Sequence, residues 1–347
     1  VSSGQAASAL SIQNLAKAGD NIVSSTDLYG GTWNLFSNTL KDMGIEVRFV
    51  DPENPSAFEE ATDDRTRAYY AETLPKPKLS VFPIEEVANI GRPLGIPLIV
   101  DNTAAPLSCK PFDYGAAVVM HSMTKWIGGH GTSIGGIIID GGNFDWGKDD
   151  KFPTLTEAYA PFTGINFWEE FGPSAFATRI RAEAMRDIGP SMSPMNAFLL
   201  LQGIETLSLR MDRHISNTRE LLKYLSSHDQ VSWVNHPDMP NHDSNALAKK
   251  YMPKGAGSII TFGVKGGREA GKAFIENVKL ASHLANVGDA KTLIIHPATT
   301  THSRIDADAL VAAGITEDMI RISVGIENVA DIQDDFNKGF RAAKKYS

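Results

Sequence analysis

The sequence predicts an α/β fold with a large domain on a mostly parallel sheet and a smaller C-terminal α/β domain. Three observations support this prediction. Short apolar runs alternate with helical periodicity through residues 6–139. Several of these runs are apolar on both faces, which is typical of a sheet covered by helices on both sides. A second group of strand and helix signals follows residue 190.

In the large domain, strands are expected where short apolar runs end in polar or turn-forming residues. These runs are residues 21–24, 45–50, 69–72, 97–100, 118–120 and 134–139. Helical periodicity predicts helices over residues 6–15, 32–43 and 84–92. Gly44 ends the second of these helices, as a glycine commonly does.

The second half of the chain changes character. Residues 143–172 are rich in aromatics, Pro and Gly without periodicity, which favours a long surface excursion. Helices are expected over 173–187 and 195–227, strands over 258–264, 292–295 and 320–324, and further helices over 268–277 and 332–343. Five apolar residues at helical spacing predict a core-facing stripe: Phe198, Leu201, Ile204, Leu207 and Met211. We place the domain boundary between 1–189 and 190–347.

Composition excludes several classes of function. The 347 residues carry a net charge of −8 and no basic run, which disfavours a nucleic-acid or anionic-membrane surface. Cys109 is the single cysteine, so no intrachain disulfide can form, and no apolar run reaches the length of a membrane span. A cytoplasmic protein acting on small molecules is therefore expected.

Lys125 lies in the most informative stretch of the chain. Ser122 and Thr124 precede it, and Gly128 and Gly129 follow. A lysine amine can form an imine with a carbonyl cofactor, hydroxyls can bind an anionic group, and glycines let the backbone approach a ligand closely. Alone, such a lysine is more often an ordinary solvated residue, so its interpretation depends on the other motifs.

Three other features converge with Lys125. Asp101 ends a predicted strand, and ligands of open α/β sheets gather at the carboxyl ends of strands. Residues 2–7 open a helix whose free N–H groups can face a phosphate. Tyr29 precedes paired glycines and offers a ring to a planar ligand. Alone, Asp101 is better explained as a turn residue and residues 2–7 as a plain N-cap, and Tyr29 could equally be a packing residue.

Together these features suit pyridoxal phosphate. This cofactor needs a lysine for a Schiff base, a carboxylate for its pyridine nitrogen, donors for its phosphate and an aromatic face. The sequence does not match two other phosphate-binding motifs. Residues 129–135 lack the spacing of the dinucleotide fingerprint, and the chain has no Gly-Lys-Ser/Thr tripeptide.

Five motifs carry a resemblance to a known family. They are Ser3-Gly4-Gln5-Ala6-Ala7, Tyr29-Gly30-Gly31-Thr32, Val100-Asp101-Asn102-Thr103, His121-Ser122-Met123-Thr124-Lys125 and Arg321-Ile322-Ser323-Val324-Gly325-Ile326-Glu327. In this order they resemble the cystathionine γ-synthase-like family of pyridoxal-phosphate enzymes, over essentially the whole chain. The similarity is closest to the O-acetylhomoserine sulfhydrylase subgroup. It implies the aspartate aminotransferase-like fold, fold type I of pyridoxal-phosphate-dependent transferases.

The resemblance implies a role for each candidate residue. Lys125 would carry the cofactor as a Schiff base and move protons, and Asp101 would pair with the pyridine nitrogen. Tyr29 would stack on the ring and assist proton transfer. The phosphate would be held by Gly4, Gln5, Ser122 and Thr124, and the substrate by Arg321 and Thr292.

Several details qualify this assignment. Arg321 suits a substrate carboxylate because a guanidinium can donate two parallel hydrogen bonds. Thr292 stands where the family usually has a serine near the lysine. Lys76 replaces an asparagine that contacts the phenolic oxygen of the cofactor, which leaves the electronic tuning of the ring open. The family's N-terminal Tyr-x-Arg element does not appear before Val1, so we expect a missing N-terminal segment.

The expected reaction is γ-replacement in methionine biosynthesis: O-acetyl-L-homoserine and sulfide give L-homocysteine and acetate. Cystathionine γ-synthase and methionine γ-lyase activities stay open as alternatives, because the same groups serve all three. Gly31 argues slightly against a methionine lyase, which often has cysteine there. An inert pyridoxal-phosphate-fold binding protein is a more distant alternative, supported only by Lys76 and the missing segment.

Two further expectations concern metals and assembly. No metal is expected, because the histidines, including His121, His130, His296 and His302, form no pair at ligand spacing. The resemblance implies a homotetramer built from dimers that share active sites. The preferred acyl group and the physiological thiol stay undetermined at this stage.

Overall fold

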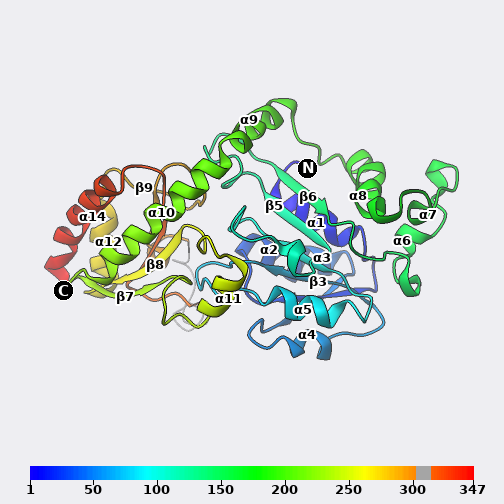
Figure 1. The fold of residues 1–347 in the computed structure, drawn as a ribbon, viewed down its shortest axis with the longest axis horizontal. Helices are drawn as coiled ribbons and strands as arrows, with labels where there is room; N and C mark the ends of the chain where they lie inside the picture. The colour runs from blue at the N-terminus through cyan, green and yellow to red at the C-terminus, as the bar shows by residue number, and fades with distance from the viewer. Residues whose placement is uncertain (302–313) are drawn as a thin grey trace.

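The computed structural model describes residues 1–301 and 314–347, which contain two β-sheets (Figure 1). The first sheet has six strands in the order β2-β1-β3-β4-β5-β6. Its neighbours pair in parallel except β5 and β6, which are antiparallel. Its strands are β1 (Asn21–Ser25), β2 (Glu46–Val50), β3 (Thr66–Glu72), β4 (Leu98–Asp101), β5 (Val118–Ser122) and β6 (Gly136–Asp140). The predicted mostly parallel sheet is thus confirmed, and the carboxyl ends of its parallel strands meet at one edge.

Helices cover both faces of this sheet. α5 (Ile84–Gly91) contributes Ile84 to one core, which also holds Tyr69 of β3. α1 (Gly4–Gln13) contributes Leu10 to the opposite core, which holds Tyr70. Successive side chains of a strand point to opposite faces, so the neighbours Tyr69 and Tyr70 enter different cores. This two-sided burial is why the strands are continuous apolar runs in the sequence.

Shorter helices and a linking segment complete the first half. They are α2 (Gly30–Asn34), α3 (Leu40–Asp42), α4 (Ser56–Glu60), α6 (Pro153–Thr156), α7 (Phe167–Phe171) and α8 (Ala175–Arg179). Residues 143–172 were expected on the surface, and this expectation is only partly met. Phe144, Trp146 and Phe152 are buried in the core on the α1 side, where the Trp146 ring stacks on Phe176. The aromatics of this segment therefore anchor it to the sheet domain.

The second sheet has five strands in the order β7-β8-β11-β10-β9. Its strands are β7 (Val231–Asn235), β8 (Ile259–Val264), β9 (Ser282–His283), β10 (Leu293–Ile295) and β11 (Met319–Ser323). Its helices are α11 (Asn245–Tyr251), α12 (Gly267–Asn277) and α14 (Val329–Ala343). Phe274 of α12 packs edge-on against Phe262 and Phe336, and with Phe340 these rings centre a separate core. This is the smaller α/β unit that the sequence predicts.

One helix joins the two cores. The expected helix 195–227 is two helices, α9 (Pro194–Glu205) and α10 (Leu207–Ser226), which meet at Thr206. Met211 of α10 packs in the large core, whereas Leu221 and Leu225 belong to the small one. Figure 1 shows α10 running from α9 towards the second sheet. Because α10 contributes to both cores, the domain boundary at residues 189 and 190 stays a prediction.

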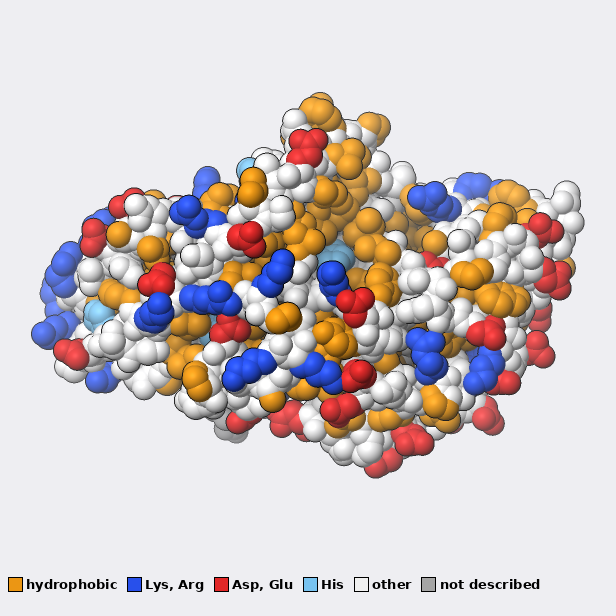
Figure 2. All heavy atoms as spheres, in the orientation of Figure 1, with side chains coloured by type: hydrophobic (Ala, Val, Ile, Leu, Met, Phe, Trp, Pro, Cys, Tyr) orange, Lys and Arg blue, Asp and Glu red, His pale blue; other side chains and the backbone are white. Residues whose placement is uncertain are grey.

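The predicted core stripe on this helix pair is wrong in its first half. Phe198, Leu201 and Ile204 are 55%, 60% and 44% exposed, whereas Leu207 and Met211 are buried. Helical periodicity identifies an apolar face but not what covers it. Figure 2 shows hydrophobic side chains gathered around the projecting α9.

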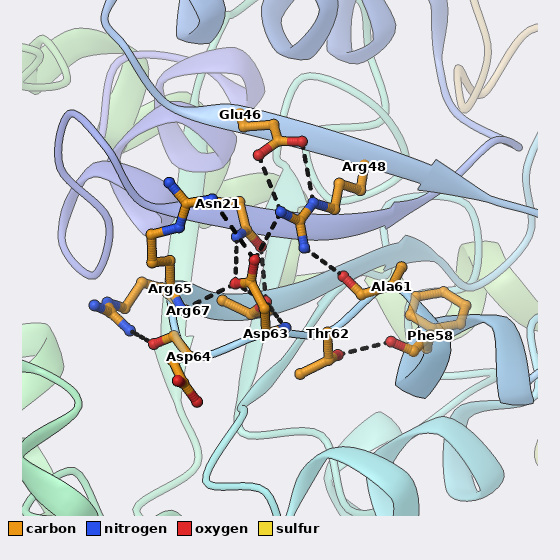
Figure 3. Close-up of polar contacts among 11 residues, drawn as sticks. Asn21, Glu46, Arg48, Phe58, Ala61, Thr62, Asp63, Asp64, Arg65 and Arg67 are labelled. Carbon is orange, nitrogen blue, oxygen red and sulfur yellow. Dashed lines mark hydrogen bonds and ion pairs between the residues drawn. The ribbon is translucent and has the colours of Figure 1, made fainter.

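Charged residues form a network at the amino ends of the large sheet's strands (Figure 3). Asp63 accepts hydrogen bonds from Asn21 and Arg48, each at 2.8 Å, and from the backbone N–H of Arg65 at 2.9 Å. Burial opposes ionisation of Asp63, but these donors outweigh it and hold its pKa well below the usual value. The network ties β1, β2 and the turn before β3 together.

Candidate functional site

A cavity of about 1010 Å³ opens at the carboxyl edge of the large sheet, between this sheet and β11. All but one of the residues predicted from the sequence line it: Gly4, Gln5, Tyr29, Asp101, Ser122, Thr124, Lys125 and Arg321. They come from the start of α1 and from the ends of β1, β4 and β5, with β11 opposite. Parallel pairing brings residues far apart in sequence to one edge, so the site follows from the topology.

Lys125 lies on the turn that follows β5, and a side chain of α10 holds the backbone of this turn in place. The buried guanidinium of Arg210 donates to the carbonyls of Trp126 at 2.6 Å and Ile127 at 3.0 Å. The Lys125 amine contacts the side-chain oxygen of Asn286. Burial, then the positive charges of Lys76 and Arg321, lower the pKa of Lys125 to about 8. A useful fraction of the amine is therefore neutral near physiological pH, as a nucleophile or base requires.

Asp101 ends β4 and is fixed by Thr103. The backbone N–H of Thr103 donates to Asp101 Oδ1 at 2.9 Å, and its hydroxyl donates to the same oxygen. The Thr103 hydroxyl also accepts the backbone N–H of Ser122 at 2.8 Å, which links the ends of β4 and β5. Burial and the charge of Glu72 raise the pKa of Asp101 to about 7. A buried carboxylate of this kind is stabilised by a cationic ligand group.

The N-terminus of α1 meets the end of β5. Ser3 caps the helix by accepting the backbone N–H of Ala6 at 3.0 Å. A Cβ added at Gly4 would lie 2.5 Å from Ser122 Cβ, so only glycine lets the helix approach this closely. Ser122 and Thr124 thus line the cavity beside the positive end of the helix dipole, and the Thr124 hydroxyl also hydrogen-bonds the Gly135 backbone. This combination binds anions such as phosphate.

Tyr29 stands immediately before α2 with its side chain 54% exposed. Its backbone N–H donates to the Glu72 carboxylate. A Cβ added at Gly31 would lie 2.5 Å from Tyr29 Cε1, so the ring rests against the bare backbone of Gly31. The paired glycines noted in the sequence therefore set the orientation of an exposed aromatic ring at the cavity.

Arg321, on β11, is the cationic group opposite Lys125. Burial lowers its pKa to about 10. Across residues 1–301 and 314–347, no carboxylate lies within ion-pair distance of its guanidinium. A partly buried cation without an anionic partner is costly unless a ligand supplies the opposite charge. The arrangement fits recognition of a substrate carboxylate.

Thr292 is the one predicted site residue that the structure does not bring to the cavity. It is fully buried, and its hydroxyl donates to Glu327 at 2.9 Å and accepts the Gly325 N–H at 3.0 Å. Asn286, which sequence reasoning missed, occupies the place beside Lys125 expected for Thr292. The register of the loop before β10 decides this, and no spacing rule fixes that register. The hydroxyl expected near the lysine is replaced by an amide.

Lys76 and Glu72 are a second pair of residues whose arrangement the sequence left open. Lys76 lines the cavity, and its amine lies 3.2 Å from Glu72 Oε2. Glu72 ends β3, beside Asp101 in the register of the sheet. The position of Glu72 at the end of a predicted strand could have marked it as a site residue, but it belongs to none of the motifs.

None of the histidines in the described ranges lines the cavity. His121 is buried with an unpartnered Nδ1, and His296 hydrogen-bonds Thr299 and the Glu317 carbonyl. His130 is exposed, and His302 lies outside the described residues. Within the described ranges, no group of three His, Cys, Asp or Glu side chains could hold a metal ion.

The chemistry of the donor set fits pyridoxal phosphate. The cavity combines a partly desolvated amine at Lys125, a partly buried carboxylate at Asp101 and the N-terminus of α1 with two hydroxyl-bearing residues. The exposed Tyr29 ring supplies an aromatic face. These are the four kinds of group that this cofactor needs.

Comparisons with known proteins agree with this chemistry. A family model described as Cys/Met metabolism PLP-dependent enzyme matches residues 1–341. Sulfhydrylase FUB7 of Fusarium oxysporum f. sp. lycopersici is 50% identical over 345 residues, covering 99% of this chain and 80% of that protein. Homocysteine synthase of Schizosaccharomyces pombe is 47% identical, with the same coverage.

A solved structure matches over nearly the whole chain. It is described as an O-acetylhomoserine (thiol)-lyase from Campylobacter jejuni and contains N′-pyridoxyl-lysine-5′-monophosphate. Its TM-score is 0.93 at 36% identity, covering 98% of this chain and 82% of that chain. The predicted pyridoxal-phosphate-dependent transferase fold and the predicted cofactor are both confirmed. The chain belongs to the pyridoxal-phosphate-dependent enzymes of cysteine and methionine metabolism.

Proposed function

We propose that this enzyme catalyses γ-replacement, converting O-acetyl-L-homoserine and sulfide into L-homocysteine and acetate in methionine biosynthesis. The observation that carries the proposal is that Lys125, Asp101 and Arg321 meet in one cavity with the start of α1. The sulfhydrylase and homocysteine synthase names of relatives at 47–50% identity support the choice of reaction. The alternatives are cystathionine γ-synthase and methionine γ-lyase activity, which the same catalytic groups would serve.

The cofactor would be held by Lys125 and Asp101, with Gly4, Gln5, Ser122 and Thr124 at its phosphate and Tyr29 against its ring. When bound, pyridoxal phosphate withdraws electrons from the carbon atoms of an attached amino acid, so that their protons become acidic. Lys125 would remove the Cα proton and then a proton from Cβ. An amine with a pKa of about 8 can both accept and return protons. Arg321 would bind the substrate carboxylate and orient Cα toward this amine.

The Asp101 carboxylate would hold a proton on the cofactor's ring nitrogen. Two hydrogen bonds from Thr103 keep it in one place, and the Thr103 hydroxyl is itself held by the backbone N–H of Ser122. A fixed carboxylate needs no reorganisation during the reaction, which is how a preorganised charge aids catalysis.

A product assay tests the proposal. Purified enzyme with pyridoxal phosphate receives O-acetyl-L-homoserine together with sulfide or cysteine in parallel reactions. We expect homocysteine from sulfide and little cystathionine from cysteine. Cystathionine as the main product would reassign the enzyme to the γ-synthases. Release of an α-keto acid in a parallel reaction with methionine alone would reassign it to the γ-lyases. Replacement of the acetyl by the succinyl ester in the same assay identifies the preferred acyl group.

We also infer a homotetramer in the cytoplasm. Support for assembly comes from α9, where Met195, Phe198 and Leu201 are more than half exposed in the single chain. Such a contiguous apolar face is typical of a subunit interface. F198D together with L201D should reduce the oligomeric state in sedimentation, and an unchanged mass would reject this face.

The single cysteine is a buried free thiol, as expected in a reducing compartment, and no described helix is suited to span a membrane.

A further inference from the structure

Three lysines line the cavity, Lys76, Lys78 and Lys125. Lys78 is the most exposed of them at 43% and is paired with Asp27 at 2.8 Å, which leaves Lys76 and Lys125 as the two amines to compare. An aldehyde condenses only with a neutral amine, so their partners decide which one can react. Lys76 Nζ forms an ion pair with Glu72 Oε2 at 3.2 Å, and the two side chains are 12% and 4% exposed. The Lys125 amine contacts the uncharged amide of Asn286, with no carboxylate within ion-pair distance in the described ranges.

Glu72 is fixed on both of its oxygens. Oε2 faces Lys76, and Oε1 accepts the backbone N–H of Tyr29. A buried carboxylate held in place favours the charged form of an adjacent amine, whereas burial without a carboxylate favours the neutral form. The same cavity therefore holds one amine that is paired with a carboxylate and one that is not.

We propose that Glu72 is a positioning residue that holds Lys76 as a cation, so that the cofactor aldehyde condenses with Lys125 and not with Lys76. In the condensation, the nitrogen lone pair of a neutral amine attacks the aldehyde carbon and a C=N bond forms. The aldehyde oxygen leaves as water with the two amine protons. A protonated Lys76 has no lone pair to donate, so it takes no part in this step.

The cation also acts on Lys125. After burial, the charge of Lys76 is the largest cause of the lowered pKa of Lys125. The charged and titratable groups that share the cavity with Lys76 are Tyr29, Glu72, Asp101, Lys125 and Arg321, while Asp27 and Lys78 pair with each other at 2.8 Å. Glu72 is the one among them within ion-pair distance of Lys76. The proposal concerns cofactor attachment and holds whichever thiol the enzyme uses.

Borohydride trapping tests the proposal without measuring activity. The full-length K125A protein is incubated with pyridoxal phosphate at about pH 7, reduced, digested and mapped for pyridoxyl-lysine. We expect little label on Lys76 in K125A and about tenfold more in K125A/E72Q, since the amine then loses its charged partner. K125A/E72D keeps a carboxylate and should stay close to K125A. Adding K76Q to K125A/E72Q should abolish the label. Equal labelling of Lys76 in K125A and K125A/E72Q would overturn the proposal.

A second measurement needs no variant. Cofactor-free wild-type protein is acetylated with trace acetic anhydride over a pH series, and the modification of each lysine is followed by mass spectrometry. We expect Lys125 to react at lower pH than Lys76. Reaction of Lys76 first would refute the role of Glu72. Trapping of the wild-type holoenzyme away from Lys125 would instead refute the placement of the cofactor in the proposed function.

Discussion

The two edges of the large sheet use charge in opposite ways. At the amino edge, Asp63 is paired with Arg48, and Arg67 lies 2.8 Å from Asp20. At the carboxyl edge Lys76 is paired with Glu72, but Lys125, and Arg321 facing it from β11, are partly buried with no carboxylate partner in residues 1–301 and 314–347. Paired charges hold a scaffold together, whereas unpaired buried charges destabilise it unless a ligand neutralises them. The comparison therefore indicates that the carboxyl edge is the one that binds a ligand.

Removal of the Lys125 amine should have the largest effect on the carboxyl edge. K125A deletes both the attachment point and the proposed base, so we expect turnover to fall by about 10³-fold or more. Folding should be retained, because the turn is held by Arg210 through backbone carbonyls. Steady-state kinetics and thermal unfolding of the variant measure the two effects. Near-normal turnover would exclude Lys125 from the reaction.

Arg321 should show the next largest effect. R321A removes the cation that we assign to the substrate carboxylate, and kcat/KM should fall by about 10²-fold. R321K is the matched variant. It keeps the charge but not the paired donors, so it should recover only part of the loss. The cofactor-free R321A protein should be at least as stable as wild type, because an unpaired buried charge is gone. A clear loss of stability would show that Arg321 serves the scaffold.

Asp101 connects stability to pH at the same edge. Its pKa is raised, so its protonated form is favoured by folding, and that stabilisation is lost as the pH rises from about 4 towards about 7. D101N mimics the protonated carboxyl. Without cofactor, we expect it to be about 2 kcal/mol more stable than wild type near pH 8, with the difference vanishing below about pH 4. Its activity should nonetheless fall. Urea unfolding at both pH values measures the difference, and equal stabilities at pH 8 would contradict the burial argument.

Asp63 should behave in the opposite sense and with the smallest effect. Its pKa is lowered, so it stabilises the fold above about pH 4 and this contribution is lost as the pH falls through the lowered pKa. Its side chain is 37% exposed, and solvent screening limits the expected loss in D63N to about 1 kcal/mol. Activity per folded molecule should not change. An altered kcat in D63N would contradict the claim that the charges at the amino edge serve only to stabilise the fold.

The sequence was sufficient for much of the site because its motifs are local. Ser122, Thr124 and Lys125 lie within four consecutive residues, and Asp101 ends a strand whose apolar run is plain. The failures all concern contacts between distant segments. Asn286 reaches Lys125 across 161 residues, and Glu72 is joined to Tyr29 across 43. Spacing rules describe one segment at a time and carry no information about such pairs.

The exposed stripe on α9 shows the same division. Phe198, Leu201 and Ile204 have the periodicity of a core face, and the sequence alone determined that this face is apolar. Only the tertiary structure decided that it lies outside the single chain's core.

By itself, the sequence determined the alternation of strands and helices, the cofactor chemistry and most of the residues that line the cavity. These follow from local periodicity and from reactive side chains within short motifs. Only the tertiary structure decided which charges are paired and which are left free. That outcome depends on the register of the strands and on the placement of β11 across the cavity from the large sheet's carboxyl edge, and the contacts involved join residues as far as 161 positions apart. Pairing sets the free energy of a buried charge, and it can be known only when both partners are placed in space.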